Sequence, residues 1–200
     1  MRTKGAATRQ TILSHAGQLA ASVGLEGVTI GRLAIDLHLS KSGLFAHFRS
    51  KEELQMQTIE HQRQRFVDMV VSPVLDTPGG EPRVLALFER WMAWRLDQPG
   101  GCFFAAASFE LDDRPGPVRD RLAVLQRQWI DTITRIAESA VKHGAFRADL
   151  DAELWAHEFY GMMLAFHLAE HLLRDPSAMA RTRRAFGQLL ARSRAAAAAA

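Results

Sequence analysis

Residues 28–54 hold the pattern that most narrowly limits how this chain of 200 residues can fold. Two short amphipathic stretches flank the turn His38-Leu39-Ser40, and Ser50 to Glu53 has the spacing of a helix capping box. Thr29 stands where the first stretch needs an N-cap. The segment therefore predicts two short helices, a tight turn and the start of a longer helix, which is the arrangement of a DNA-reading helix-turn-helix.

The rest of the chain follows the same helical pattern. Apolar residues recur three and four positions apart, and no stretch alternates apolar and polar residues for long enough to predict a strand. Pro73 is expected to end the fourth helix, and Asp151 and Asp175 to cap the last two. The chain is therefore predicted to be all-α. About nine helices are expected, at roughly 3–23, 30–37, 41–48, 51–71, 83–96, 102–111, 118–143, 152–173 and from 176 onward.

The composition is that of a globular protein. Hydrophobic residues make up 48% of the chain and charged residues 24%, which supplies enough apolar material for a sizeable core. The N-terminus lacks the apolar region of a signal peptide, and the longest apolar runs are far shorter than a membrane span. We expect a soluble cytoplasmic protein that does not contact a membrane.

Positive charge is concentrated at the N-terminal end. Residues 1–51 contain seven lysines and arginines against two acidic residues, whereas the remainder contains 18 against 20. Such an excess suits a surface that binds phosphates, although a solvated basic face would have the same composition. The imbalance therefore supports nucleic-acid binding only together with the helix-turn-helix.

The segment at 41–48 has the residue types of a recognition helix. Its first turn combines one long donor with small residues, so the backbone can approach the floor of the major groove. Lys41 can donate to guanine, Ser42 can bind a base or a phosphate, and Gly43 removes side-chain bulk. These three residues are the expected base-reading group.

Other residues of the segment are expected to hold it in place. Leu44 and Phe48, one turn apart, should point into the core. Thr29, His47 and Lys51 should bind phosphates, the last at the positive end of the helix that follows. A short amphipathic helical hairpin without any DNA contact is the alternative interpretation of the same residues.

Residues 44–51 read Leu-Phe-Ala-His-Phe-Arg-Ser-Lys. This matches a pattern of the tetracycline-repressor (TetR) family, in which a leucine, an aromatic, a variable residue, a histidine and an aromatic precede a Ser-Lys pair that opens a helix. The stretch from about 8 to 60 therefore resembles the N-terminal domain of that family. The remaining residues agree with the family in length, helical character and helix count.

Three residues depart from the family pattern. Phe45 replaces the usual tyrosine, so it lacks a phenolic donor and can instead offer an apolar edge to a thymine methyl. His38 replaces the usual turn glycine and must accept a left-handed backbone, which His tolerates better than most residues. Gly31 stands where some relatives carry a base-reading side chain. Base reading is thus expected to depend mainly on the helix at 41–48.

The resemblance implies two functional parts and a short tail. Residues 1–51 would form the DNA-binding domain, residues 52–194 a ligand-binding and dimerisation domain, and residues 195–200 a low-complexity tail. Two subunits would associate through the helices at 152–173 and from 176 onward. Their recognition helices would then lie about 34–36 Å apart on a palindromic operator in double-stranded DNA.

The resemblance also implies a site for a small-molecule effector among the helices of the second domain. An aromatic and methionine-rich lining with few polar groups would suit an apolar or aromatic effector. Any one of these side chains could instead belong simply to the core. The candidates are Phe66, Met69, Trp91, Met92, Trp94, Phe103, Phe104, Phe109, Trp129, Ile133, Tyr160 and Met163, with His61 and Glu110 as orienting groups.

The expected activity is that of a repressor that the effector releases from its operator. Effector binding would shift the helix that begins at Lys51 and, through the Ser50-Lys51 junction, change the separation of the recognition helices. Ligand and operator would then weaken each other's binding by the same factor. The alternative within DNA binding is a constitutive regulator that has no effector.

One motif points to a different class of protein. His167, Glu170 and His171 have the H-x-x-E-H spacing of inverted zinc metallopeptidases, with both imidazoles on one helical face. Such a site needs a third protein ligand, and Asp175 is the only acidic residue after His171. A zinc hydrolase is therefore the remote alternative. We expect no enzyme, metal or cofactor, and the histidine pair is expected to contribute polar groups to the dimer interface.

Overall fold

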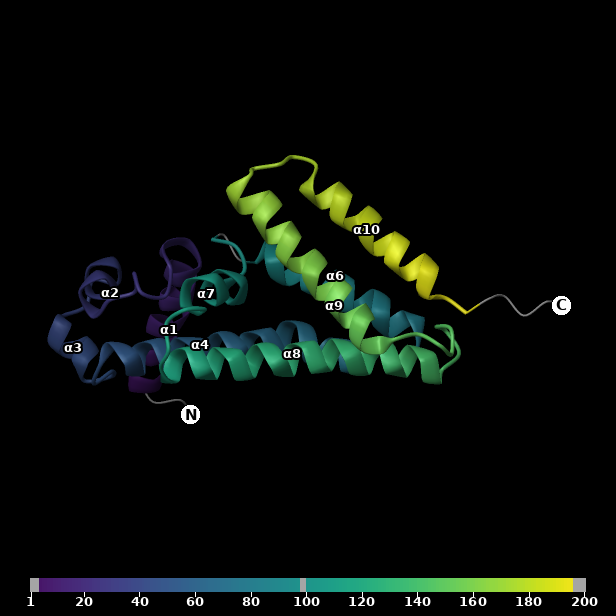
Figure 1. Cartoon of the computed structure of the whole chain (residues 1–200). Coiled ribbons are helices and arrows are strands. Elements are labelled where there is room, and N and C mark those ends of the chain that lie inside the picture. The colour runs from purple at the N-terminus through teal and green to yellow at the C-terminus, as the bar shows by residue number, and fades with distance from the viewer. Residues whose placement is uncertain (1–3, 98–99, 196–200) are drawn as a thin grey trace. The chain divides into compact units, whose positions relative to one another are not determined.

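The computed structural model describes residues 4–97 and 100–195. Regular structure in these residues is helical (Figure 1). The exception is one isolated β-bridge between Phe146 and Arg194. The prediction of an all-α fold is confirmed. No helix in this part of the chain is both long and apolar enough to cross a membrane. The elements are α1 (Lys4–Val23), α2 (Ile30–Asp36), α3 (Lys41–Phe45), α4 (Lys51–Phe66), the π-helical turn η1 (Val67–Val71), α5 (Ser72–Leu75), α6 (Glu81–Leu96), α7 (Phe103–Leu111), α8 (Pro117–Lys142), α9 (Ala152–His167), the π-helical turn η2 (Leu168–Leu172) and α10 (Ala178–Ser193).

The chain divides into two compact units. Unit 1 comprises Met1–Val67 and Arg95–Leu125, and unit 2 comprises Asp68–Trp94 and Gln126–Ala200. These units are defined by internal contacts, whereas the predicted boundary between residues 51 and 52 divides the chain by function. That boundary remains a prediction.

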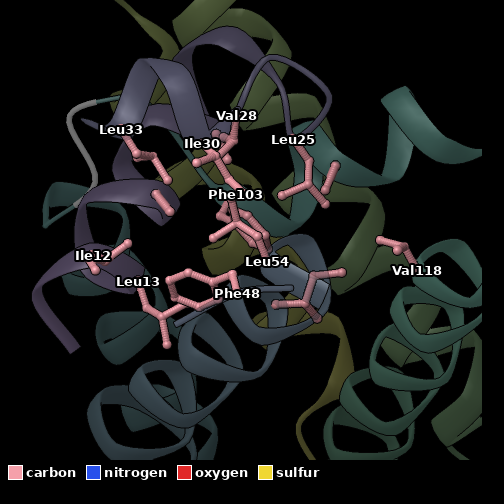
Figure 2. Packing of buried hydrophobic residues seen from close by; sticks show 14 of the residues in the cluster. Ile12, Leu13, Leu25, Val28, Ile30, Leu33, Phe48, Leu54, Phe103 and Val118 are labelled. Carbon is pink, nitrogen blue, oxygen red and sulfur yellow. The ribbon is translucent and has the colours of Figure 1, made fainter. Parts of the chain in front are cut away.

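Unit 1 is built around an aliphatic core to which α1, α2, α3, α4, α7 and the start of α8 contribute. Ile12 and Leu13 of α1 pack with Leu33 of α2, and Phe48 and Phe103 add the large rings (Figure 2). All five side chains are buried. The apolar spacing that predicts these helices thus also predicts the side of each helix that is buried.

The helix after Ser50 does not end before Pro73, and this prediction was wrong. The chain passes from α4 through η1 into α5 and stays helical to Leu75. The π-helical turn shifts the hydrogen-bond register, so Pro73 falls in the first turn of α5, where a missing amide costs nothing. If these three segments are counted as one helix, and α9 with η2 as another, the described residues contain the nine predicted helices.

Two predicted helix ends are also corrected. The third helix ends at Phe45 and not at Phe48, because the His47 amide bonds to the Leu44 carbonyl (2.9 Å) in a tighter turn that brings Phe48 into the core. The last helix begins at Ala178 and not at Pro176. Asp175 accepts from the Ser177 amide (2.8 Å) in the preceding turn, so it caps that turn and not the helix itself.

Unit 2 is held together by aromatic rings. Phe88 of α6 stacks on Phe186 of α10, with ring centroids 4.1 Å apart and an interplanar angle of 1°. Trp155 and Phe159 of α9 stack at 5.3 Å, and Phe159 meets Trp91 of α6 edge-on at 6.4 Å. The helices α6, α9 and α10 therefore share one aromatic core.

The predicted low-complexity tail lies almost entirely outside the described residues. Of its members only Ala195 is described, and its amide donates to the Ala145 carbonyl (3.1 Å). The predicted cap of the preceding long helix is confirmed, because the Asp151 carboxylate accepts from the Leu154 amide (2.9 Å) at the start of α9.

Candidate nucleic-acid interface

Hydroxyl caps hold α2 and α3 at fixed starting points. The Thr29 hydroxyl accepts from the Arg32 amide (3.1 Å), as predicted, and Ser40 makes the corresponding bond to the Gly43 amide (3.0 Å). Between the two helices His38 adopts a left-handed backbone with φ 54°, which confirms the conformation expected for it. Short-range side-chain chemistry thus builds the turn.

The first turn of α3 is exposed above a buried anchor. Lys41, Ser42 and Gly43 face solvent, whereas Leu44 is completely buried and Phe48, beyond the helix, is buried beneath it. Phe45 leaves 54% of its surface exposed. The structure therefore brings the predicted base-reading group together on an open surface and places the two predicted anchors in the core.

Two glycines lie beside this surface. A Cβ at Gly31 in α2 would lie 3.8 Å from the Lys41 Cε, so the lysine stem passes over that glycine. A Cβ at Gly43 would lie 3.0 Å from the Ser40 hydroxyl oxygen and would crowd the cap of α3. Gly43 therefore also protects a structural bond, a role that its sequence position does not indicate.

The predicted phosphate ligands lie in different surroundings. Thr29 is exposed, and the half-buried His47 ring lies 6.2 Å from the Phe48 ring, measured between centroids. The Lys51 ammonium is 2.8 Å from the Glu26 carboxylate, and both side chains are about half exposed. Lys51 is therefore tied to the loop between α1 and α2 while its surface remains open to solvent.

The capping box at the start of α4 is present in a modified form. The Ser50 hydroxyl accepts from the Glu53 amide (3.0 Å), as predicted. The Glu53 carboxylate accepts from the Arg49 amide (2.9 Å) and not from the Ser50 amide as in the usual box. The glutamate thus fixes the chain one residue earlier, in the link between Phe48 and α4.

Two polar contacts brace the interface from α1, and sequence analysis did not predict them. Arg9 donates twice to the Gln57 side-chain oxygen (2.9 and 2.6 Å), and its guanidinium lies 5.6 Å from the centroid of the Phe48 ring. His15 Nε2 lies 3.1 Å from the Asp36 carboxylate at the end of α2. The partners are 48 and 21 residues apart, so no local pattern marks them.

Asp36 also binds Arg32 of its own helix, at 2.9 and 3.0 Å. The hydrogen bond from His15 and then those from Arg32 lower the pKa of the Asp36 carboxyl below its usual value. The charged form of the carboxylate is therefore favoured, and it links α1 to α2.

The predicted effector residues divide between the two units. In unit 1, His61 and the Phe66–Phe104 pair are half-buried, and the two phenyl rings meet edge-on at 5.9 Å. Phe103 belongs to the core, whereas Phe109 is 61% exposed. Glu110 accepts hydrogen bonds from the Leu25 and Glu26 amides, so its carboxylate is already occupied within the protein.

The effector candidates in unit 2 are mostly core residues. Trp91, Trp94, Trp129 and Met163 are buried, and Tyr160 is half-buried. Met92 and Ile133 are buried as well, and Met69 is half-buried. Because Trp91 packs on Phe88, Phe159 and Phe166, its ring has a structural task whether or not an effector binds.

The His167/Glu170/His171 motif forms a close group on η2 and the end of α9. The two imidazole centroids are 4.9 Å apart, and His171 Nε2 lies 3.4 Å from the Glu170 carboxylate. Burial and then the neighbouring His171 lower the pKa of His167. Within residues 4–97 and 100–195, no set of three or more His, Cys, Asp or Glu side chains is arranged to hold a metal.

Comparisons with known proteins bear on both parts of the chain. Residues 12–55 match the family model described as bacterial regulatory proteins, tetR family. Residues 80–186, more than half of the chain, match the model described as tetracyclin repressor-like, C-terminal domain. No curated protein matches the sequence.

Solved structures of similar fold cover nearly the whole chain. A TetR transcriptional regulator from Chloroflexus aurantiacus aligns with a TM-score of 0.84 and 22% identity over 98% of this chain and 100% of its own. AibR in complex with isovaleryl coenzyme A and operator DNA aligns at 0.72 and 20%, over 91% and 97%. A putative regulator from Saccharomonospora viridis in complex with choline aligns at 0.76 and 20%, over 92% and 95%.

At these identities the solved structures show a shared fold, and the family models carry the assignment. Members of that family are DNA-binding transcription factors and not enzymes, so the zinc hydrolase alternative has no support. Taken with the capped helix-turn-helix and its exposed first turn, the matches show that the chain belongs to the TetR family of transcriptional regulators.

Proposed function

We propose that the protein is a ligand-responsive repressor, which binds a palindromic operator as a homodimer and leaves it when a small apolar or aromatic effector binds. The observation that carries the DNA-binding part is the exposed first turn of α3 above the buried Leu44 and Phe48. A rigid anchor under an open turn is what base reading in the major groove requires. Such a protein would act in the cytoplasm, where its operator is.

The DNA contacts divide by chemistry. Lys41, Ser42 and Gly43 would face base edges, with Phe45 against a thymine methyl. Thr29, His47 and Lys51 would hold phosphates, which positions the protein without reading sequence. Lys51 would do so while paired with Glu26, because about half of its side chain remains exposed.

The dimer would form through α9, η2 and α10. Leu154, Leu168, Leu172 and Leu173 are all at least half exposed, although they are large apolar residues. A second copy of the chain would cover them in an isologous interface. We therefore keep residues 52–194 as the proposed ligand-binding and dimerisation domain, and residues 1–51 as the proposed DNA-binding domain.

An effector is proposed because two proteins of the same fold are complexed with isovaleryl coenzyme A and with choline. Within unit 1, the half-buried His61 and Phe66–Phe104 pair are candidates, and Phe109 is more exposed. Within unit 2, Tyr160 and Met69 are the corresponding half-buried candidates. The buried members of the predicted set would contribute packing around such groups.

The DNA-binding part is tested by selection from a pool of random-sequence duplexes with the wild-type chain. The expected product is an inverted repeat whose half-sites are centred one helical turn apart. Affinity for that duplex should fall with salt, and Lys51→Ala should flatten the slope by about one. Lys142→Ala, an exposed lysine of α8, is the matched control and should leave the slope unchanged. Failure to enrich any duplex would refute the proposal.

The effector part is tested with tryptophan fluorescence. All four tryptophans of the chain lie in unit 2, so their emission reports that unit and not the helix-turn-helix. A library of small aromatic acids and amines would be titrated first against free protein and then against the selected duplex complex. Quenching together with release of the duplex supports an effector. Quenching without release favours the alternative, a constitutive regulator.

A further inference from the structure

Glu110 of α7 reaches across unit 1 to the loop that joins α1 and α2. Its Oε2 accepts from the Leu25 amide (2.6 Å), and its Oε1 accepts from the Glu26 amide (2.8 Å). One carboxylate thus holds two consecutive backbone amides, 85 and 84 residues away in the chain. Charge-assisted bonds of this kind are stronger than bonds between neutral groups.

The loop is shaped to admit this carboxylate. Gly24 has φ +82°, a left-handed conformation in which a side chain is strained. A Cβ at this position would lie 2.8 Å from Glu110 Oε1 and 2.9 Å from Oε2. The same glycine therefore turns the chain at the end of α1 and lets the carboxylate approach the amides that follow.

The loop is fastened to the start of α4 as well. The Glu26 carboxylate binds the Lys51 ammonium and the Gln55 side-chain amide, each at 2.8 Å, and Gln55 also donates to the Leu25 carbonyl (3.3 Å). The bonds from Lys51 and then Gln55 lower the pKa of Glu26. A chain of polar contacts thus leads from α7 through residues 24–26 to the first turn of α4.

The position of α7 links this chain of contacts to the C-terminal part of the sequence. By sequence, α7 lies inside residues 80–186, the part that matches the C-terminal domain model. In the structure it shares a compact unit and a core with the helix-turn-helix, through Phe103, Ala107 and Leu111. A displacement of α7 would therefore pull directly on the loop that precedes α2.

We propose that Glu110 is a positioning residue that couples α7 to the DNA-binding helices, through the amides of the 24–26 loop and the Glu26 contacts to Lys51 and Gln55. This rests on the proposed function, and it adds a second route to the Ser50-Lys51 junction at the start of α4. When α7 holds the loop, α2 and the start of α4 keep the spacing that DNA binding needs. When α7 moves, both elements lose their common support.

The first test measures amide exchange and DNA affinity in the full chain. In Glu110→Ala, exchange at Leu25 and Glu26 should accelerate, and exchange at Glu53 and Leu54 in the first turn of α4 should accelerate with it. Affinity for the duplex selected with wild-type protein should fall by about tenfold. In Glu110→Gln the side-chain carbonyl still accepts from one amide, so the affinity of this variant for the duplex should lie between those of wild type and Glu110→Ala. Asp113→Ala, an exposed acid on the adjoining loop, should match wild type.

The results separate a coupling role from a local cap. Faster exchange at Leu25 and Glu26 alone, with unchanged affinity, would overturn the proposal, because a cap without coupling predicts that pattern. The second test combines Glu110→Ala with Glu26→Gln. A single chain of contacts predicts that the double variant binds the duplex no more weakly than the weaker single variant, whereas fold-losses that multiply would refute the chain. If wild-type protein selects no duplex, the proposed function fails, and the exchange data still report on the Glu110 contact.

Discussion

The two units of this protein use polar side chains differently. In unit 1, polar groups reach from one element to another through the interior. Gln55 bonds the loop after α1, and Glu110 of α7 bonds two amides of the same loop. In unit 2, the buried hydroxyls of Thr182 and Ser193 bond carbonyls of their own helix (2.8 and 2.7 Å), and aromatic rings make buried contacts between helices. The ion pair between Arg183 of α10 and Glu89 of α6 lies at the surface.

The difference shows how each unit can respond to a perturbation. A polar contact has one productive geometry, so a small shift breaks it and the elements it joins separate. Stacked rings tolerate a small lateral shift at lower cost. Deleting one of them, however, leaves a cavity that lowers stability. Unit 1 is therefore the part in which single polar substitutions should change function, and unit 2 the part in which large apolar deletions should change stability.

The largest effect is expected in the aromatic core of unit 2. Phe159 is fully buried and contacts Trp155, Trp91 and Phe186. Phe159→Ala should lower the free energy of unfolding by about 3–5 kcal/mol, because it leaves a cavity among rings that cannot collapse around it. Urea denaturation followed by circular dichroism measures this. Phe109→Ala, with an exposed ring, should stay within about 0.5 kcal/mol of wild type, and equal losses in the two variants would contradict the distinction.

A smaller effect on the free energy of unfolding is expected where α1 packs on α4, and its sign should depend on the residue at position 62. A Cβ at Gly17 would lie 1.6 Å from the Nε2 of the fully buried Gln62. Gly17→Ala should therefore destabilise the wild-type chain by about 1–3 kcal/mol through overpacking. In a Gln62→Ala background the same change should stabilise by about 1 kcal/mol, since alanine favours a helix over glycine. The same sign in both backgrounds, measured by urea denaturation, would show that Gln62 does not determine this contact.

Removing the N-cap of α3 should lower the stability of that helix by about 1 kcal/mol. Ser40→Ala removes the acceptor for the Gly43 amide in a helix of five residues. Amide exchange at Gly43 should accelerate, and affinity for the selected duplex should fall with it. Ser22→Ala, which loses a bond to a carbonyl of its own helix, is the control and should leave both unchanged. Loss of DNA affinity with unchanged exchange at Gly43 would assign Ser40 to direct DNA contact.

The smallest effect is a dependence of stability on pH. Burial, and then the nearby Arg65, lower the pKa of His61 below 6.5. The unfolded chain therefore takes up a proton at His61 before the folded chain does, and stability decreases as pH falls through about 6.5. His61→Gln should flatten the fall in the urea midpoint between about pH 7.5 and pH 5.5, and His157→Gln, an exposed control, should not. Identical curves for both variants would show that His61 is not the group responsible.

What sequence can predict here depends on how far apart the partners are. Thr29, Ser50 and Asp151 bond amides three residues away, and all three caps are confirmed. The Glu110 and Arg9 contacts join residues that only the folded chain brings together, so neither leaves a pattern in the sequence. The helix-turn-helix was predictable because its turn chemistry is local.

The roles of the aromatic residues could not be predicted from the sequence. A tryptophan or phenylalanine has the same periodicity whether it fills a core or lines a site, so composition alone could not separate Trp91 from Tyr160. The structure does so by burial. Pro73 is a related case, because proline ends most helices and only the π-helical turn η1 allows this one to continue.

We propose that the exposed first turn of α3 reads bases. The most direct test repeats the selection from random-sequence duplexes with Lys41→Ala beside wild-type protein. Wild type should enrich an inverted repeat. The variant should keep the repeat but lose its preference at one base pair in each half-site, with about tenfold lower affinity for the wild-type sequence. Identical preferences at every position would contradict the claim.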